Sequence, residues 1–355
     1  MTTTDPVITE AARARNEALT LREKARFIDL DSRYLLQMAH LTTPATVWKY
    51  VEGACTKSAA NLVMLDLEDS IPRGNSELLA QGRANVVRAY QELDWGNRLR
   101  FFRPRGVELD PGHEDIQFVV GACGAKIDGL IYPKTETADE VRSIDETLTA
   151  LEQKHDLPAG KIKLEVLIES AAAEEDVFAI ARASKRLVGL IFGAFDYWGS
   201  LGMVGEPYVT DHPLVQHARA RIVKAAASVG VPAIAEMTLN YPTKEKSPAE
   251  RQAALDECRA DAIIAKQFGF AGKWTGIPQQ TAIAVEVFTL RDEIIETAVD
   301  EAKTFLAAER EGRGAVMIKG KMADRATDRI NRVTLKTAFA LGKLDAATAA
   351  ELGIR

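Results

Sequence analysis

Charged side chains follow a series of short apolar segments along the chain. These residues are Glu68 after residues 62–67, Arg103 after 99–102, Lys134 after 130–133, Glu169 after 164–168, and Asp196 shortly after 187–192. In a β/α barrel the carboxyl ends of the parallel strands meet on one face, where the active site lies. The spacing therefore predicts that these charges converge on a single site.

Glu169 and Asp196 end consecutive predicted strands, so the two carboxylates can share one hard cation. Two carboxylates completed by water and substrate oxygens are a usual way to hold Mg²⁺. Glycines at 193, 199 and 202 around Asp196 would let backbone approach a ligand closely. The competing interpretation is that each acid caps the helix that follows it.

Arg103 lies at the end of its predicted strand, with Arg105 two residues later. A guanidinium at a strand tip can hold a carboxylate through two parallel hydrogen bonds, and it keeps its charge when desolvated. Arg103 is therefore a predicted substrate-binding and catalytic residue. Arg105 is equally well explained by a surface salt bridge.

Three acids, Asp66, Glu68 and Asp69, lie close together where the second predicted strand runs into Ile71 and Pro72. Strand alternation places Asp66 and Glu68 on one face and Asp69 on the other. Because a barrel interior tolerates carboxylates only when they are paired or near a metal, one of the first two is expected to orient Arg103 or metal-bound water. Asp69 is expected to cap the next helix.

Eight extended segments alternate with helical patterns, which predicts an α/β fold, a (β/α)8 TIM barrel. The predicted strands are 35–38, 62–67, 99–103, 129–133, 163–168, 187–192, 231–235 and 272–276. The predicted helices between them include 45–59, 76–91, 138–154, 171–183, 213–228 and 248–267. A doubly wound open sheet is the main rival, but no glycine-rich phosphate loop follows the early strand.

The barrel is expected to span residues 31–295, between a polar N-terminal helical arm at 1–30 and a C-terminal helical lid at 296–355. One or two helices are predicted over 282–308, a loop over 312–320, and a polar helix over 324–341 and beyond. Since the barrel closes without these last segments, they are interpreted as a lid or an element exchanged between subunits.

The 355 residues carry a formal net charge of −6, with basic residues spread along the chain, which argues against nucleic acid or anionic membranes as partners. The three cysteines have no paired spacing, and the start of the chain lacks the apolar region of a signal peptide. A cytoplasmic protein is expected.

None of the five histidines has metal-ligand spacing, and His40 is expected at the surface.

Several of these segments together resemble the citrate lyase beta-chain and malyl-CoA lyase family of aldolase-type barrels. They are Leu-Asp-Leu-Glu-Asp-Ser-Ile-Pro at 65–72, Tyr-Pro-Lys-Thr-Glu-Thr at 132–137, Leu-Ile-Glu-Ser-Ala at 167–171, the segment 193–202 around Asp196, and the segment 217–225 around Arg219. The similarity runs from residue 33 to about residue 334.

The resemblance implies an Mg²⁺-dependent carbon–carbon lyase or synthase acting on a 3-hydroxyacyl thioester such as malyl-, citramalyl- or citryl-CoA, carried by CoA or an acyl-carrier protein. Glu169 and Asp196 would be the metal ligands, and Arg103 would bind the 2-oxo acid. Gly193, Ala194, Phe195 and Lys134 would line the substrate site, with Lys134 in an ion pair rather than a Schiff base.

The segment 314–324 is similar to the family's Gly-Lys-Met-x-Asp motif, whose acid reaches into a neighbouring subunit. This implies that Asp324 is the general acid or base of a homo-oligomer, a trimer or hexamer. Without the resemblance, Asp324 is an ordinary helix N-cap candidate.

Two departures bear on the substrate. Ile277 stands where the family usually has a histidine, and Ala235 and Glu236 follow Ile234 where Asp-Gly is usual. Two other functions remain open: a class II aldolase that releases a 2-oxo acid such as pyruvate from free hydroxy-oxo acids, and a non-catalytic barrel that acts as a binding or assembly subunit.

Overall fold

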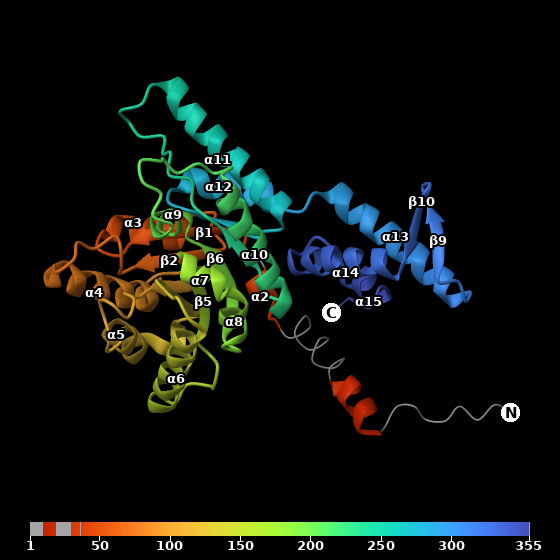
Figure 1. The fold of residues 1–355 in the computed structure, drawn as a ribbon, viewed down its shortest axis with the longest axis horizontal. Coiled ribbons are helices and arrows are strands. Elements are labelled where there is room, and N and C mark those ends of the chain that lie inside the picture. The colour runs from red at the N-terminus through yellow and green to blue at the C-terminus, as the bar shows by residue number, and fades with distance from the viewer. Residues whose placement is uncertain (1–9, 19–29, 36, 355) are drawn as a thin grey trace.

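The computed structural model describes residues 10–18, 30–35 and 37–354. Eight parallel strands form a closed barrel in sequence order, with β1 hydrogen-bonded to both β2 and β8. The strands are β1 Ala39–Pro44, β2 Leu62–Asp66, β3 Leu99–Arg103, β4 Gly129–Tyr132, β5 Lys163–Ile168, β6 Leu187–Phe192, β7 Ala233–Ala235 and β8 Gly272–Thr275. The predicted TIM-barrel fold is confirmed, and helices surround the strands in Figure 1.

The first strand was wrongly predicted at residues 35–38, because it actually spans Ala39–Pro44. Its inward-facing positions carry polar side chains, among them His40 and Thr42, so it lacks the apolar pattern of the other strands. The apolar residues before it lie outside the strand, where Gln37 donates a hydrogen bond to the Val188 carbonyl.

Helices follow the strands around the barrel. They are α3 Trp48–Lys57, α4 Ser76–Glu92, α5 Glu114–Cys123, α6 Ala138–Lys154, α7 Ala171–Glu175, α8 Val177–Arg182, α9 Ala194–Ser200, α10 Pro213–Val229, α11 Pro248–Phe268 and α12 Pro278–Phe288. The helix predicted at 171–183 is divided at Asp176, and α5 and α9 were not predicted. Capping boxes at Thr137 and Ser247 begin α6 and α11.

Strand alternation divides the core into two layers. Outward residues such as Leu65, Phe102 and Val166 pack against the helices. Inward residues such as Met64 and Phe101 fill the barrel itself.

His40 lies inside the barrel and is fully buried, so the expected surface position was wrong. Its Nε2 atom lies 2.8 Å from Gln37 Oε1, and its Nδ1 atom lies 3.5 Å from Glu165 Oε2. Burial lowers the pKa of His40 to about 3 and raises the pKa of Glu165 to about 8, because each charged form is desolvated. Both side chains are therefore neutral at pH 7.

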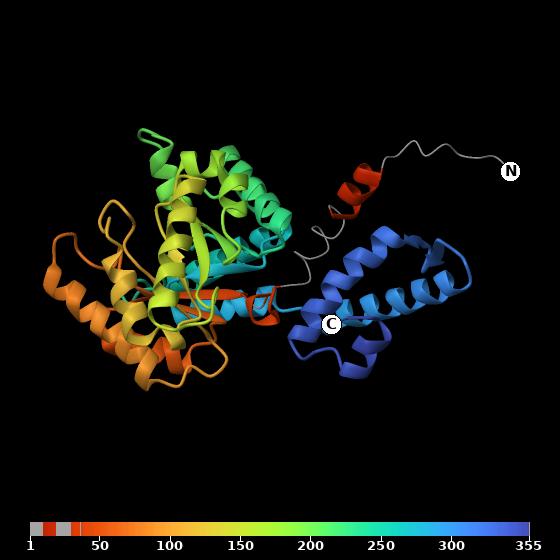
Figure 2. The same ribbon diagram turned by 90° about the horizontal axis from the view of Figure 1, so that it is seen from below.

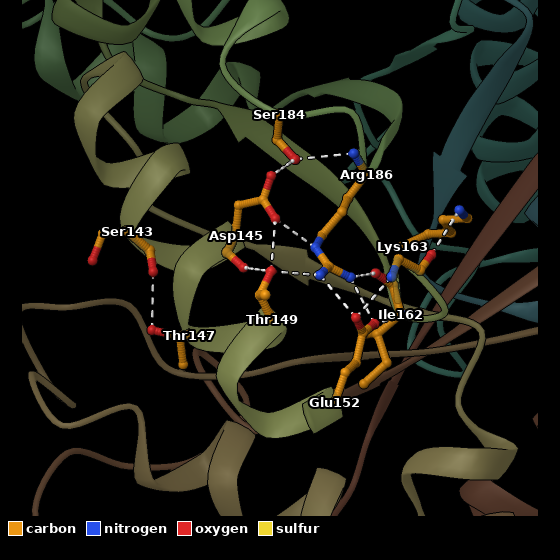
Figure 3. A network of polar contacts seen from close by, with 10 residues as sticks. Ser143, Asp145, Thr147, Thr149, Glu152, Ile162, Lys163, Ser184 and Arg186 are labelled. Carbon is orange, nitrogen blue, oxygen red and sulfur yellow. Dashed lines mark hydrogen bonds and ion pairs between the residues drawn. The ribbon is translucent and has the colours of Figure 1, made fainter. Parts of the chain in front are cut away.

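Arg186, just before β6, ties α6 to the strands, as Figure 3 shows. Its guanidinium donates to Asp145 at 2.6 Å and to both oxygens of Glu152 at 2.6 and 2.8 Å. Glu152 also accepts the backbone N–H groups of Gly160 and Ile162. This network satisfies the buried charges and fixes the loop that leads into β5.

A second, smaller unit follows the barrel and stands beside it in Figures 1 and 2. It comprises α13 Asp292–Arg310, β9 Ala315–Ile318, β10 Lys321–Asp324, α14 Arg325–Ala340 and α15 Ala346–Glu351. Residues including Ala302, Leu335 and Leu352 form its own apolar core. Helix α14 also packs against α2 Ser32–Leu35.

The loop predicted at 312–320 was wrong, because β9 and β10 form an antiparallel hairpin there. Its two turn residues, Lys319 and Gly320, have φ values of 48° and 78°. Positive φ at both positions is typical of the tight turn that joins two short strands. Two four-residue strands with no clear alternation gave little sequence signal.

Residues 10–18 of the predicted N-terminal arm are helical, and the rest of the arm lies largely outside the described residues. The boundaries proposed at residues 30 and 295 remain predictions. Within the described part of the chain, none of the helices combines the length and hydrophobicity needed to cross a bilayer.

Candidate active site

The site residues on β2 and β3 occupy the last inward-facing position of each strand. In β2, Leu62 and Met64 face the barrel interior and are followed two residues later by Asp66. Arg103 follows Leu99 and Phe101 in β3 in the same way. The two-residue period of a strand thus points both side chains into the barrel mouth.

Asp66 and Arg103 form a bidentate ion pair. The Arg103 Nε and Nη2 atoms donate to Asp66 Oδ1 and Oδ2 at 2.7 and 2.9 Å, and both side chains are buried. Burial by itself raises the pKa of Asp66, but the Arg103 charge and hydrogen bonds outweigh it and hold that pKa below its usual value. The prediction that one of the acids orients Arg103 agrees with this geometry.

Glu68 and Asp69 both lie against the same guanidinium, at 2.9 and 3.4 Å from Arg103 Nη1. The expectation that Asp69 faces away was wrong, because β2 ends at Asp66 and strand alternation stops there. Asp69 does not cap α4 either, since Asn75 does. Burial raises the pKa of Glu68 to about 8.

Glu169 follows β5, and its side chain is only 2% exposed. Its Oε1 atom accepts the Lys134 backbone N–H at 2.6 Å, whereas its buried Oε2 atom has no hydrogen-bond partner among the described residues. Gly193 makes this packing possible, since a Cβ there would lie 2.5 Å from Glu169 Cβ. Burial raises the pKa of Glu169 to about 6.

Asp196 lies in the first turn of α9, the helix that follows β6, and its carboxylate lies near Lys134 and Glu169. Its Oδ1 atom lies 2.9 Å from Lys134 Nζ, which is also 3.7 Å from Glu169 Oε2. Glu169 does not cap a helix, because the Ser170 side chain caps α7, and Asp196 makes no capping bond at the start of α9. The capping interpretation therefore does not apply to these two acids.

Lys134 lies at the end of β4 with a φ of 52°, and its Nζ atom also lies 3.9 Å from Glu68 Oε1. Burial opposes its charge, but the surrounding carboxylates outweigh burial and raise its pKa to about 12. The side chain is thus a charged ion-pair lysine, and a Schiff base would require the opposite shift.

Negative charge exceeds positive charge in this cluster. Among the described residues, five carboxylates surround two cations; the acids are Asp66, Glu68, Asp69, Glu169 and Asp196, and the cations are Arg103 and Lys134. Because burial raises the pKa of Glu68 to about 8, this acid is largely protonated at pH 7, and about two negative charges remain unbalanced. Within the described chain, no three His, Cys, Asp or Glu side chains converge to hold a metal ion. The carboxylates of Glu169 and Asp196 suit Mg²⁺, an ion that keeps much of its water when it binds to a protein. The Glu169 Oε2 atom, which has no hydrogen-bond partner among the described residues, is available as a ligand.

Aromatic side chains border the site. The Arg103 guanidinium lies 5.6 Å from the ring of Trp274, whose indole N–H donates to Thr42. Trp274 was given no functional role from the sequence, although its inward position in β8 indicates this contact. Trp198, two residues after Asp196 in α9, packs edge-on against Tyr208.

A cavity of about 480 Å³ opens beside Glu68 and Asp69. It extends to the start of α4, where Arg73 and Ser76 line it. This volume falls within the range of small-molecule sites. Arg105 also lines it but is held by Asp115 through two hydrogen bonds, which fits the salt-bridge interpretation.

The two departures from the family pattern, Glu236 and Ile277, lie at the ends of β7 and β8. Glu236, one of the departures, pairs with Arg219, whose guanidinium also donates to the Thr210 carbonyl at 2.9 Å. The pair is buried and joins the end of β7 to α10. Ile277, the other departure, precedes α12 without a capping side chain.

Asp324 is the last residue of β10, and Figure 1 shows β10 in the C-terminal unit, away from the barrel of its own chain. Its carboxylate accepts the N–H groups of Ala326 and Thr327 and caps α14. The capping interpretation is therefore confirmed, and a catalytic role would have to be played in another subunit.

Residues 47–275 match the model of the HpcH/HpaI aldolase/citrate lyase family. An L-malyl-CoA/beta-methylmalyl-CoA lyase of Rhodobacter capsulatus is 34% identical over 300 residues, covering 79% of this chain and 88% of the relative.

Solved structures show the same fold. A citrate lyase from Burkholderia xenovorans matches with a TM-score of 0.71 and 21% identity, over 89% of this chain and 96% of that one. CitE of Mycobacterium tuberculosis, in complex with magnesium, acetoacetate and coenzyme A, matches with a TM-score of 0.59 and 22% identity, over 85% and 97% of the two chains. The chain belongs to the HpcH/HpaI aldolase/citrate lyase family, whose members are carbon–carbon lyases.

Proposed function

We propose that this protein is an Mg²⁺-dependent lyase that cleaves or forms a 3-hydroxyacyl-CoA such as malyl-, citramalyl- or citryl-CoA. The observation that carries the proposal is the excess of carboxylates around Arg103 and Lys134. Such a site cannot accept an anionic 2-oxo acid until a further cation offsets the negative charge. The malyl-CoA lyase relative and the magnesium complex of CitE support this choice.

Glu169 and Asp196 would hold the cation, which would supply Lewis-acid stabilisation of negative oxygen. Arg103 is positioned to bind the carboxylate of the 2-oxo acid. Asp66 occupies two of its five N–H groups and Glu68 lies 2.9 Å from Nη1, so a ligand carboxylate would share the Nη1 side of the guanidinium with Glu68. Gly193, Ala194 and Phe195 would form the adjoining wall, and Glu68 lies against Arg103 at the same edge.

In cleavage, the bond between the hydroxyl-bearing carbon and the thioester α-carbon breaks. The hydroxyl loses its proton as the 2-oxo acid forms, and the enolate of the thioester takes up a proton at its α-carbon. A carboxylate on a covering element can transfer that proton once water is excluded. Asp324 of a neighbouring subunit is the proposed group.

This role requires an oligomer, for which a trimer or hexamer is proposed. The C-terminal unit exposes apolar side chains on α14 and the hairpin, which are Met317, Met322, Ile330 and Val333. Met317 and Met322 are paired across the two strands. A surface of this kind is typical of a protein interface.

A substrate screen tests the proposal. Release of 2-oxo acid would be followed from malyl-, methylmalyl-, citramalyl- and citryl-CoA, with Mg²⁺ or with EDTA. EDTA-sensitive release from one thioester would support the lyase and identify its acyl group. Activity only on free hydroxy-oxo acids would instead favour the class II aldolase.

A further inference from the structure

The position of Lys134 raises a problem for metal binding. Its Nζ atom lies 2.9 Å from Asp196 Oδ1 and 3.7 Å from Glu169 Oε2. These are the two carboxylates that the proposed function assigns to the cation. An ammonium group and a divalent cation repel each other, so both cannot occupy the space between the same carboxylates.

The backbone of Lys134 is also held close to these carboxylates. Its backbone is held in the left-handed region, at a φ of 52°, while its own N–H donates to Glu169 Oε1 at 2.6 Å. A positive φ is costly for a residue with a side chain, and it persists where surrounding structure enforces it. One residue therefore holds Glu169 through its backbone and contacts both carboxylates through its side chain.

We infer that Lys134 is an internal counter-cation that competes with the divalent cation for Glu169 and Asp196 and gives way when the metal binds. The inference rests on the proposed function. The ammonium keeps the two acids together before the metal arrives, and it can leave because its side chain is 31% exposed and that of Asp196 is 52% exposed. The backbone hydrogen bond to Glu169 does not depend on the side chain and stays in place.

Competition predicts that removing the ammonium strengthens metal binding. Mn²⁺ would be titrated into the apoprotein and the free ion measured by electron paramagnetic resonance, for wild type and Lys134→Gln. Glutamine removes the charge and keeps the backbone N–H. We expect Lys134→Gln to bind Mn²⁺ at least about fivefold more tightly, the equivalent of one favourable ion pair.

Arg73→Gln is the matched control, because Arg73 lies on the same rim but pairs with Glu108. It removes the same charge, so a general electrostatic effect would tighten Mn²⁺ binding equally in both variants. Equal tightening, or no tightening in Lys134→Gln, would overturn the inference. If neither the wild type nor Lys134→Gln binds Mn²⁺, the proposed function fails and this inference fails with it.

Thermal unfolding supplies a second readout. In EDTA, Lys134→Gln should melt below wild type, because Glu169 and Asp196 lose their counter-charge. Saturating Mg²⁺ should reduce or reverse that difference. A difference unchanged by Mg²⁺ would show that Lys134 has a purely structural role and would count against competition.

Discussion

Arg103 and Asp66 meet across neighbouring strands through two hydrogen bonds of 2.7 and 2.9 Å. β2 and β3 are paired in register at these two residues, so the sheet itself sets their separation. Asp66 therefore fixes the orientation of the guanidinium and turns its Nη1 group toward Glu68 and Asp69. This pair is the basis of the first prediction.

Arg103→Lys should lower kcat/KM by at least about a hundredfold, because lysine keeps the charge but cannot form the bidentate fork. Steady-state kinetics on the thioester identified by the screen would measure this. Arg100→Lys is the control, since Arg100 makes a similar two-bond contact with Asp128 at the opposite end of β3. An equal loss in both variants would assign Arg103 a structural role.

Asp66→Asn should reduce the free energy of unfolding by about 3–5 kcal/mol, because it leaves the buried Arg103 charge without its partner. Urea denaturation followed by circular dichroism would measure the change. Unchanged stability would indicate that Glu68 and Asp69 compensate for the lost charge.

Glu169→Gln and Asp196→Asn should each abolish turnover that depends on Mg²⁺ and weaken Mn²⁺ binding, because each removes a charged ligand. Calorimetric titration and the thioester assay would test both effects. Glu175→Gln is a suitable control, since Glu175 is an exposed acid in the helix after Glu169. Metal binding that survives both site substitutions would place the metal elsewhere.

Asp324→Asn should lower kcat by about a hundredfold or more by removing a proton-transfer group, while metal binding and stability stay near wild type. Asparagine is as good an N-cap as aspartate, so α14 should stay capped. Asp345→Asn makes the same change at the cap of α15 and should leave turnover intact.

Mixing subunits tests whether Asp324 acts in a neighbouring subunit. Asp324→Asn and Glu169→Gln proteins should each be inactive alone, and co-refolding them should restore part of the turnover. The rescued sites would combine Glu169 from one chain with Asp324 from the other. No rescue in a verified mixed oligomer would contradict the shared site.

Glu165 should make stability depend on pH. Burial raises its pKa from the ordinary value of 4.5 to about 8, so the unfolded chain releases this proton at lower pH than the folded protein does. The stabilisation that protonated Glu165 gives the folded protein is therefore fully present below about pH 4.5 and is lost as the pH rises through about 8. Between pH 5.5 and 8, wild type should lose roughly 2 kcal/mol or more relative to Glu165→Gln.

Chemical denaturation across that pH range would measure the difference. Glu146→Gln, at an exposed position of α6, controls for the loss of one carboxylate. Parallel profiles for wild type and Glu165→Gln would mean that Glu165 is ionised inside the barrel.

Much of the barrel could be predicted from the sequence because its signals are local. Seven extended segments matched β2 to β8, and charges at Glu68, Arg103 and Glu169 marked the carboxyl ends of three of these strands. Strand alternation also placed Asp66 on the inward side. These features depend on neighbours one or two residues away, so they can be recognised without knowledge of the fold.

Other features depend on contacts between distant segments. β1 was missed because its inward residues are polar, and only barrel closure shows that His40 meets Glu165 from the far side. Asp69 turns toward Arg103 because β2 ends before it, which alternation alone does not predict. The hairpin of β9 and β10 lacked the length and alternation that mark a strand.

The sequence by itself determined the barrel, its inward and outward faces and the identity of the charges at the strand ends. Only the tertiary structure decided how those charges pair. Asp66 holds Arg103, and Lys134 lies between Glu169 and Asp196. The physical reason is that pairing of charges depends on distances of a few ångströms between side chains far apart in the chain, and closure of the barrel sets those distances.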